Sequence, residues 1–354
     1  MKNVENDLKD VAFWLSVEDY IMTMSQGTAS QGIMSRDIGE ARYFLTWRVR
    51  PCVVIGRNQI AEAELDLELA KRENVGVTRR SSGGGAVYLD PGAIQYAVIQ
   101  PYAPGISDDT MRAAREQVAG MIARALNRFG VGAITEGRND ITAGGAKVSG
   151  ISQLTRGGWL NTHGTLLYDT DLNKLSGLLK PDTDKFQSKA VQSVRSRVSN
   201  IKPLIADQDK AVDADQFKNI IETAVREEAK AMGRPLLKFD PDDEQLATIN
   251  KMRDEVYANP VHTFRASPPY TYRSSRRFPQ GKVEIFIGVK GGLVSSCAIR
   301  GDFIGVSPVE DIELALLGLP FQLADFDGVI SEDDIKDHLG GVGKKEFLDL
   351  IFGI

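Results

Sequence analysis

The chain has 354 residues, 42% of them hydrophobic and 26% charged, which is the composition of an ordinary globular protein and is long enough for two domains. A formal net charge of -5 argues against a general nucleic-acid or membrane-surface binder, whose surface would be basic. No apolar run has transmembrane length, no signal-peptide core is found, and Cys52 and Cys297 are too few and too far apart for a disulfide framework, so we predict a cytoplasmic protein without a membrane partner.

The N-terminal half combines amphipathic helices with short apolar strands. The first helix is predicted from Val11 to Met24, where Val17 and Ile21 recur at helical spacing. A longer helix is predicted from about Asp108 to Phe129, and Gly130 is well placed to end it. We also predict a short helix over 65–73 and strands over 43–48, 52–55, 75–78, 86–88, 94–99, 132–135, 140–142, 147–154 and 159–168.

The C-terminal half contains a candidate domain boundary. Residues 180–210 are polar and without a clear period, so we predict a long loop that is either a functional lid or disordered. A boundary is expected at Asn259-Pro260, because the residue before a proline is biased away from helix. We therefore predict two domains, residues 1–258 and a small α+β unit over residues 259–354. The remaining predicted elements are helices over 215–232, 243–257, 308–317 and 332–339, and a hairpin with strands over 283–289 and 293–299.

Between two predicted strands lies a glycine-rich segment, Arg79-Arg80-Ser81-Ser82-Gly83-Gly84-Gly85-Ala86-Val87-Tyr88. Three consecutive glycines cost backbone entropy on ordering, and such a run usually serves close approach of a ligand or an unusual backbone conformation. The two arginines add positive charge and bidentate donors suited to phosphate or carboxylate. The alternative is a glycine-rich hairpin turn with solvated arginines.

A second cluster comprises Gly137-Arg138-Asn139-Asp140-Ile141 and, shortly after it, Gly144-Gly145-Ala146-Lys147-Val148-Ser149-Gly150. A lysine at the start of a buried strand is costly unless its ammonium has an anionic partner, and against a phosphoryl group Lys147 would act as a point charge. The alternative is a surface hairpin on which Lys147 is solvated. No Walker-type or Gly-x-Gly-x-x-Gly pattern occurs, which argues against P-loop and Rossmann folds.

Two further segments carry polar side chains. His163, within Asn161-Thr162-His163-Gly164-Thr165, suggests a catalytic role, although a single histidine on a strand is more often structural. Arg195 and Arg197, within residues 193–200, form either an anion-binding patch or a solvated basic edge.

Taken together and in their order, these segments resemble the lipoate–protein ligases. The resemblance rests on residues 79–88, 137–141, 147–150, 163–167 and 193–200, and it extends to the C-terminal unit through Ser267-Pro268, Phe278, Gly281 and Gly301-Asp302-Phe303. It implies an α+β fold with a mixed, largely antiparallel sheet flanked by helices, as in the biotin and lipoate ligases, followed by a small α+β accessory domain.

The resemblance also implies a two-step reaction. ATP and lipoate form lipoyl-AMP, and a lysine of an acceptor protein then attacks the mixed anhydride. The acceptors would be lipoyl domains of 2-oxoacid dehydrogenase acyltransferase subunits and the glycine-cleavage H protein. In the family, the segment matching residues 178–192 closes over the adenylate.

The same resemblance assigns roles to individual residues. Lys147 would be catalytic, neutralising charge as the carboxylate attacks the α-phosphorus of ATP. Asn139 and Asp140 would contact the nucleotide or Mg²⁺. The phosphate and carboxylate oxygens would be clamped by Arg80 and by the backbone of Gly83, Gly84, Gly85, Ala86, Val87 and Tyr88, and the substrate site would be completed by Gly150, His163 and Gly164.

The chain departs from the family pattern after Tyr88. The family usually continues His-Asp-x-Gly-Asn, whereas this chain has Leu89-Asp90-Pro91-Gly92-Ala93, and Gln95 is the candidate to replace the lost amide. One alternative function is transfer of octanoyl or lipoyl groups from a carrier protein, but such enzymes use a cysteine after the His-Gly segment, and this chain has none there. The other is a catalytically silent adenylate-binding homologue, favoured only by Leu89 and Ala93.

Overall fold

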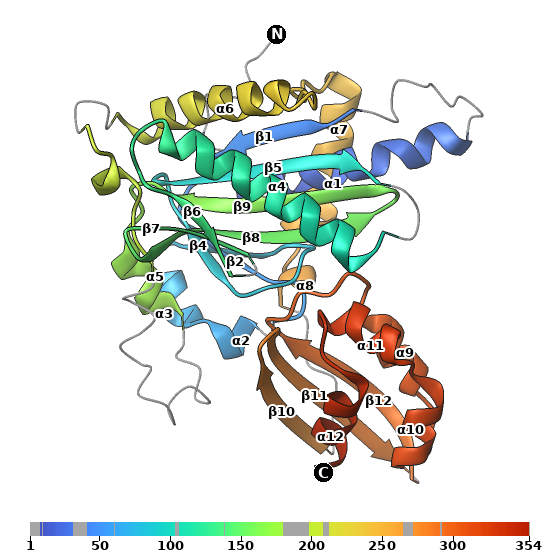
Figure 1. The fold of residues 1–354 in the computed structure, drawn as a ribbon. Coiled ribbons are helices and arrows are strands. Elements are labelled where there is room, and N and C mark those ends of the chain that lie inside the picture. The colour runs from blue at the N-terminus through green and yellow to red at the C-terminus, as the bar shows by residue number, and fades with distance from the viewer. Residues whose placement is uncertain are drawn as a thin grey trace. The chain divides into compact units, whose positions relative to one another are not determined.

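The computed structural model describes residues 8, 10–30, 41–59, 61–102, 106–137, 139–179, 198–207, 212–264, 272–290 and 292–353. The chain divides into two compact units (Figure 1). The first comprises residues 1–54, 66–78 and 87–263, and the second comprises residues 55–65, 79–86 and 264–354. Most of the glycine-rich segment thus groups with the C-terminal residues. The predicted boundary between residues 258 and 259 stays a prediction.

The first unit is built on a six-stranded sheet in the order β1-β5-β9-β8-β7-β6, in which every pair of neighbours is antiparallel (Figure 1). The strands are β1 (Tyr43–Trp47), β5 (Ala93–Pro101), β9 (Trp159–Leu167), β8 (Ala146–Arg156), β7 (Asp140–Ala143) and β6 (Ile134–Glu136). Successive side chains of a strand point to opposite faces, so each strand contributes to two different layers.

Helices cover both faces of this sheet because both carry apolar side chains. On one face, Ile94, Tyr96 and Val98 of β5 pack in a buried cluster with α4 (Asp108–Asn127) and α6 (Ala214–Ala231). On the other face, Ala93 and Ala97 pack in a second cluster. The helices on that side are α1 (Val11–Ser30) and α7 (Asp243–Met252), followed by a π-helical turn (Arg253–Tyr257) and α8 (Pro260–Thr263).

Smaller elements lie largely in the first unit. A three-stranded sheet has the order β3-β2-β4, formed by β2 (Cys52–Ile55), β3 (Gly76–Arg79) and β4 (Val87–Leu89), of which the last residues of β2 and β3 are grouped with the second unit. The remaining elements are α3 (Leu67–Arg72), α5 (Leu172–Leu178) and a 3₁₀ turn (Lys202–Leu204).

The second unit has its own core. Its three-stranded antiparallel sheet has the order β10-β11-β12, formed by β10 (Tyr272–Phe278), β11 (Gly281–Lys290) and β12 (Leu293–Gly301). Phe303, Phe326 and Phe347 are fully buried within one apolar cluster of this unit. Its helices are α2 (Ala61–Glu64), α9 (Glu310–Leu316), α10 (Leu323–Val329), α11 (Glu332–Leu339) and α12 (Lys344–Phe352).

The predicted fold class is confirmed: a largely antiparallel sheet lies between helices, and a small α+β unit follows it in the chain. Strand β10 was not predicted, because its sequence Tyr-Arg-Ser-Ser-Arg-Arg-Phe lacks the apolar alternation of a half-buried strand and its centre is exposed. Its backbone pairs along its length with β11, and its end residues Tyr272 and Phe278 pack in the apolar cluster of the second unit. Within the predicted loop over 180–210, residues 180–197 and 208–210 lie outside the described residues, and Arg195 and Arg197 are among them. Over the described part of the chain, no helix is both long and apolar enough to cross a membrane.

Candidate functional site

An irregularity in the β7–β8 hairpin determines which way Lys147 points. The turn is made by Gly144 and Gly145, whose φ values of 58° and 80° suit a two-residue hairpin turn. Asp140 lies opposite Gly150, but a register shift after Ile141 then places Thr142 opposite Lys147. Because residues opposite each other in an antiparallel pair share a face, this bulge brings Lys147 to the same face as Asp140 and Gly150.

The ammonium of Lys147 lies over Gly150 and beside the carboxylate of Asp140. Lys147 Nζ is 2.6 Å from Asp140 Oδ1, and each side chain is about one-third exposed. A Cβ added at Gly150 would lie 2.8 Å from Lys147 Nζ and 2.9 Å from its Cε, so the missing side chain at Gly150 provides the space that the lysine occupies. The geometry supports a cation fixed at one place on the sheet, and the alternative of a freely solvated Lys147 is not supported.

The same face carries a polar row across five strands. The paired registers align Trp47, Gln95, Thr165, Gly150 and Asp140. Thr165 Oγ1 donates a hydrogen bond to Gln95 Oε1 at 2.8 Å, and both residues are buried. The lysine–carboxylate pair and the Gln95–Thr165 pair therefore lie on the same face of the sheet.

Asn139 serves the backbone at the end of this hairpin. Its Nδ2 donates to the carbonyl of Ile151 at 3.3 Å, and the amide of Ile151 donates to the carbonyl of Asn139 at 2.8 Å. Asn139 therefore holds β7 against β8 at the end where Asp140 begins. Arg138 lies outside the described residues.

His163 contacts a buried carboxylate that the sequence analysis did not identify. Glu18, on α1, is 3% exposed, and its Oε2 lies 2.8 Å from His163 Nδ1. The same oxygen accepts a hydrogen bond from Asn161 Nδ2 at 2.8 Å, and Glu18 Oε1 accepts one from Trp47 Nε1 at 3.3 Å. These contacts hold the imidazole of His163 in one orientation, as expected of a structural histidine, and a catalytic role for it stays a prediction. The only local signal for Glu18 was a carboxylate on the apolar side of a predicted helix.

Gly164 is required by packing on the opposite face. A Cβ there would lie 2.4 Å from Tyr96 Oη, 2.5 Å from its Cζ and 2.7 Å from the carbonyl oxygen of Gly150. The Tyr96 hydroxyl shares a hydrogen bond of 3.0 Å with Ser149 Oγ, and burial raises the pKa of Tyr96. Gly164 thus lets a buried tyrosine support the strand that carries Lys147.

In the second unit, Arg80 organises the glycine-rich segment from inside. Its Nη2 donates to the carbonyls of Gly83 at 2.7 Å and Gly85 at 2.8 Å, and its Nε donates to Ser82 Oγ at 3.1 Å. The side chain is 7% exposed, and burial lowers the pKa of Arg80 to about 10. These contacts fix the curvature of the segment through its carbonyls.

Each of the three glycines in this segment is suited to its position for a different physical reason. A Cβ at Gly83 would lie 2.5 Å from the carbonyl oxygen of Phe303, and Gly84 has a φ of 92° that side chains disfavour. At Gly85, by contrast, φ is ordinary and a Cβ would lie within 4 Å of no atom in the part of the chain that the structure describes. Gly85 is exposed, so its missing side chain leaves the backbone open to an approaching molecule. This favours the ligand interpretation of the segment over a simple turn.

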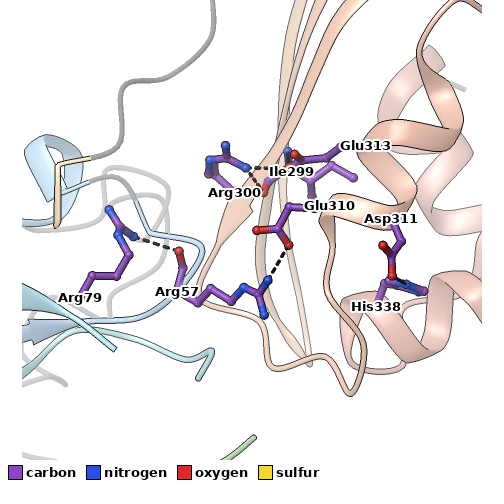
Figure 2. A network of polar contacts seen from close by, with 8 residues as sticks. All are labelled: Arg57, Arg79, Ile299, Arg300, Glu310, Asp311, Glu313 and His338. Atoms are coloured by element: carbon purple, nitrogen blue, oxygen red, sulfur yellow. Dashed lines mark hydrogen bonds and ion pairs between the residues drawn. The ribbon is translucent and has the colours of Figure 1, made fainter. Parts of the chain in front are cut away.

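Arg79 has a structural role in the second unit (Figure 2). Its Nη1 donates to the carbonyls of Gly56 at 3.0 Å, Arg57 at 3.0 Å and Gln59 at 2.6 Å. Arg57 in turn forms an ion pair of 2.9 Å with Glu310 at the start of α9. The paired arginines of the motif thus shape two neighbouring backbone segments.

The positions that depart from the family pattern belong to the apolar core. Leu89 and Ala93 are 1% and 0% exposed and lie in the cluster under α1. Between them, Asp90 Oδ1 accepts hydrogen bonds from the amides of Gly92 at 2.9 Å and Ala93 at 3.1 Å. A turn closed by hydrogen bonds to the Asp90 carboxylate therefore stands where the family usually has polar side chains. Val87 and Tyr88 belong to β4 just before this turn, and Tyr88 is buried.

The side chains present do not form a dedicated magnesium site. Asp140 Oδ1 already lies against Lys147 Nζ, and in the described part of the chain no group of three or more His, Cys, Asp or Glu residues is arranged to hold a metal ion. Mg²⁺ is commonly held by one or two carboxylates together with substrate phosphates. Asp140 alone is too few protein ligands to hold the ion without them.

Comparison with known proteins gives consistent results along the chain. A family model described as the lipoyl protein ligase A/B catalytic domain matches residues 10–226, and one described as the bacterial lipoate protein ligase C-terminus matches residues 267–351. The lipoate-protein ligase LplJ of Bacillus subtilis is 32% identical over 88% of this chain and 92% of its own length. Lipoate–protein ligase 1 of Staphylococcus aureus is 30% identical over 98% of both chains.

Solved structures share the fold. The crystal structure of LipL1 of P. falciparum in complex with lipoate has a TM-score of 0.74 at 20% identity, covering 96% of this chain and 95% of that one. A bipartite lipoate protein ligase of Thermoplasma acidophilum, studied with its E2 lipoyl domain, has a TM-score of 0.59 at 21% identity and covers 75% of this chain and 96% of that one.

Proposed function

Because this chain belongs to the lipoate–protein ligase family, whose members are ligase enzymes, we propose that it activates free lipoate with ATP to lipoyl-AMP and transfers the lipoyl group to a specific lysine of an acceptor protein. The family and the enzyme class predicted from the sequence motifs are thereby confirmed. The two-step chemistry is the further step of this proposal.

The observation that carries the proposal is the placement of Lys147. Formation of an acyl-adenylate brings a carboxylate against a phosphate, so negative charge accumulates at the reacting atoms. A cation already held in position lowers the activation barrier of this step, because it does not have to reorganise as the negative charge develops. The contact with Asp140 and the space over Gly150 support such a preorganised ammonium.

The glycine-rich segment supports a role in binding phosphate and carboxylate oxygens. Backbone amides can approach an anion closely where no Cβ intervenes, and Gly85 offers such a place. Arg80 contributes indirectly, since its contacts with Gly83 and Gly85 hold the segment in one shape. We assign Arg80 primarily as a positioning residue and the backbone from Gly83 to Tyr88 as the binding surface.

ATP and Mg²⁺ are the cosubstrate and ion of the proposed reaction. A solved lipoate-protein ligase A bound with ATP shares the fold at a TM-score of 0.56 and 21% identity. Since the side chains of the described residues alone do not make a magnesium site, the ion would arrive on the nucleotide, with phosphate oxygens as its main ligands. Asn139 and Asp140 remain the proposed nucleotide contacts on the hairpin.

The carrier-protein transferase is not favoured, because that reaction needs a reactive thiolate. Cys52 is fully buried in the core, and burial raises its pKa; burial likewise raises the pKa of Cys297 to about 12. Both are free cysteines, in keeping with the reducing cytoplasm that we propose as the compartment.

The silent homologue is also not favoured. Its only support was the replacement of polar residues by Leu89 and Ala93, and both side chains are packed into the core.

The proposed acceptors are lipoyl domains of 2-oxoacid dehydrogenase acyltransferase subunits and the glycine-cleavage H protein, with no nucleic-acid or membrane partner.

The test is the mass of a lipoyl-domain acceptor after incubation with the enzyme, Mg²⁺ and either free acid, with and without ATP. We expect a gain equal to the acyl group only when ATP is present. A gain that requires an acylated carrier protein instead would support the transferase. Tight binding of adenylate with no gain in mass would support the silent homologue.

A further inference from the structure

Gln95 is a buried polar side chain whose hydrogen-bonding capacity is only partly used. It is the third residue of β5, is 7% exposed, and its two neighbours on the same face, Ala93 and Ala97, are apolar and fully buried. Gln95 Oε1 accepts a hydrogen bond from Thr165, but Nε2 donates to no described residue. A buried amide group without its partner costs free energy, and such a group in a folded protein calls for an explanation.

The position of the amide relative to Lys147 suggests what it donates to. Gln95, Thr165 and Gly150 are aligned on neighbouring strands, and the hydrogen bond to Thr165 draws the head of Gln95 toward Gly150. Gln95 and Gly150 lie two strand spacings apart, about 10 Å, because β9 lies between their strands. Since Gln95 Oε1 is 2.8 Å from Thr165 Oγ1, the side chain of Gln95 extends toward β9 and narrows the gap to the ammonium over Gly150. One carboxyl group bound in this gap can accept from both donors, with one oxygen for each.

We propose that Gln95 is a substrate-binding residue that donates a hydrogen bond from Nε2 to one oxygen of the acyl substrate's carboxyl group, while Lys147 contacts the other. This inference rests on the proposed function. Thr165 acts as a positioning residue, because its hydroxyl occupies Oε1 and leaves the NH₂ group directed at the substrate. The contact concerns the carboxyl end shared by all fatty acids and not the distinctive ring of lipoate.

A conservative pair of substitutions tests the donor. Gln95→Met keeps the length of the side chain and removes its polar amide. Gln95→Glu keeps an acceptor for Thr165 but replaces the amide donor with a carboxylate, whose negative charge repels the carboxylate of the substrate. Binding of lipoate and of octanoate to the full chain is measured by calorimetry. A hydrogen bond to a charged group predicts a loss of about ten- to a hundredfold for Gln95→Met, equal for the two acids, and a larger loss for Gln95→Glu.

Thermal stability separates this role from a structural one. Gln95→Met loses one hydrogen bond, the one from Thr165, but it also relieves the desolvation cost of the unpartnered Nε2. The melting temperature of the ligand-free variant is therefore expected to fall only slightly, and by less than that of a variant that loses a fully bonded amide. Gln153 is the matched control: it is 2% exposed, but its Nε2 donates to Met111 and Thr162 and its Oε1 accepts from Arg115. Gln153→Met should therefore lower the melting temperature.

Three outcomes would overturn the inference. Unchanged binding of both acids by Gln95→Met would mean that the amide holds only a water molecule. A loss for lipoate alone would place the amide at the ring end of the substrate. A fall in melting temperature as large as that of Gln153→Met would indicate a structural residue. If the wild-type chain binds neither acid, the proposed function fails before Gln95 is tested, so the two failures are distinguishable.

Discussion

Substitution of Gly150 by alanine would move the ammonium of Lys147, the proposed catalytic group, without removing it. The new Cβ would lie 2.8 Å from Lys147 Nζ and 2.9 Å from Cε, whereas ordinary van der Waals contacts begin at 3.4 Å. The ammonium must therefore shift by at least about 0.6 Å, the difference between the two distances. A displacement of about 1 Å at a reacting centre can cost about a hundredfold in rate, so we expect lipoate-dependent pyrophosphate release to fall about ten- to a hundredfold.

The same substitution should leave the fold intact. Among the described residues, the only close neighbours of the added methyl group are atoms at the far end of the Lys147 side chain, which is flexible, and the backbone of Gly150 is not in the left-handed region. The ion pair with Asp140 is partly exposed, so its loss costs at most about 1 kcal/mol, and the reduced freedom of the unfolded chain offsets part of that. Urea unfolding should therefore give a free energy within about 1 kcal/mol of wild type.

Gly164→Ala is the control with the opposite expectation. Its Cβ would clash with the buried ring of Tyr96 and the carbonyl of Gly150, neither of which can move away freely, so it should destabilise the fold by about 1–3 kcal/mol or more. A wild-type rate for Gly150→Ala would refute the claim that the ammonium works from its place over Gly150. A loss of stability matching that of Gly164→Ala would refute the claim that only the lysine must move.

Further predictions concern charge, loop shape and thiol reactivity. Lys147→Ala should reduce pyrophosphate release by about a hundredfold or more at nearly unchanged stability. The control Lys202→Ala removes a lysine from a comparable 2.7 Å ion pair with a carboxylate and should leave the rate unchanged. Equal rates for the two variants would contradict the role of Lys147. Arg80→Ala should lower the free energy of unfolding by about 1.5–3 kcal/mol and raise the KM for ATP or lipoate, because it removes the hydrogen bonds to the carbonyls of the glycine-rich segment. An unchanged KM would show that the segment keeps its shape without the guanidinium. Iodoacetamide at pH 8 should label Cys52 and Cys297 far more slowly in the native than in the urea-unfolded protein, since burial raises both thiol pKa values and leaves little reactive thiolate. Rapid labelling of either cysteine in the native protein would support the thioester-transfer mechanism instead.

Local sequence was sufficient to predict most strands and helices, because side-chain periodicity depends only on neighbouring residues. It also identified the glycine-rich segment and Lys147, because glycine runs and a lysine at the start of a buried strand are unusual wherever they occur. Strand β10 lay beyond such reasoning, since its pairing with β11 comes from the backbone of another strand.

The partners of these residues depended on the tertiary structure. Alternation along β8 alone would place Lys147 and Gly150 on opposite faces, and only the bulge opposite β7 brings them together. Glu18 meets His163 because the fold brings α1 against β9, although 145 residues separate the two in the chain. The Phe303 carbonyl, which accepts a hydrogen bond from the amide of Gly84, likewise comes from a distant segment. Short-range spacing therefore determined which groups the protein carries, whereas strand order and register determined which of them meet, because those depend on contacts between residues far apart in sequence.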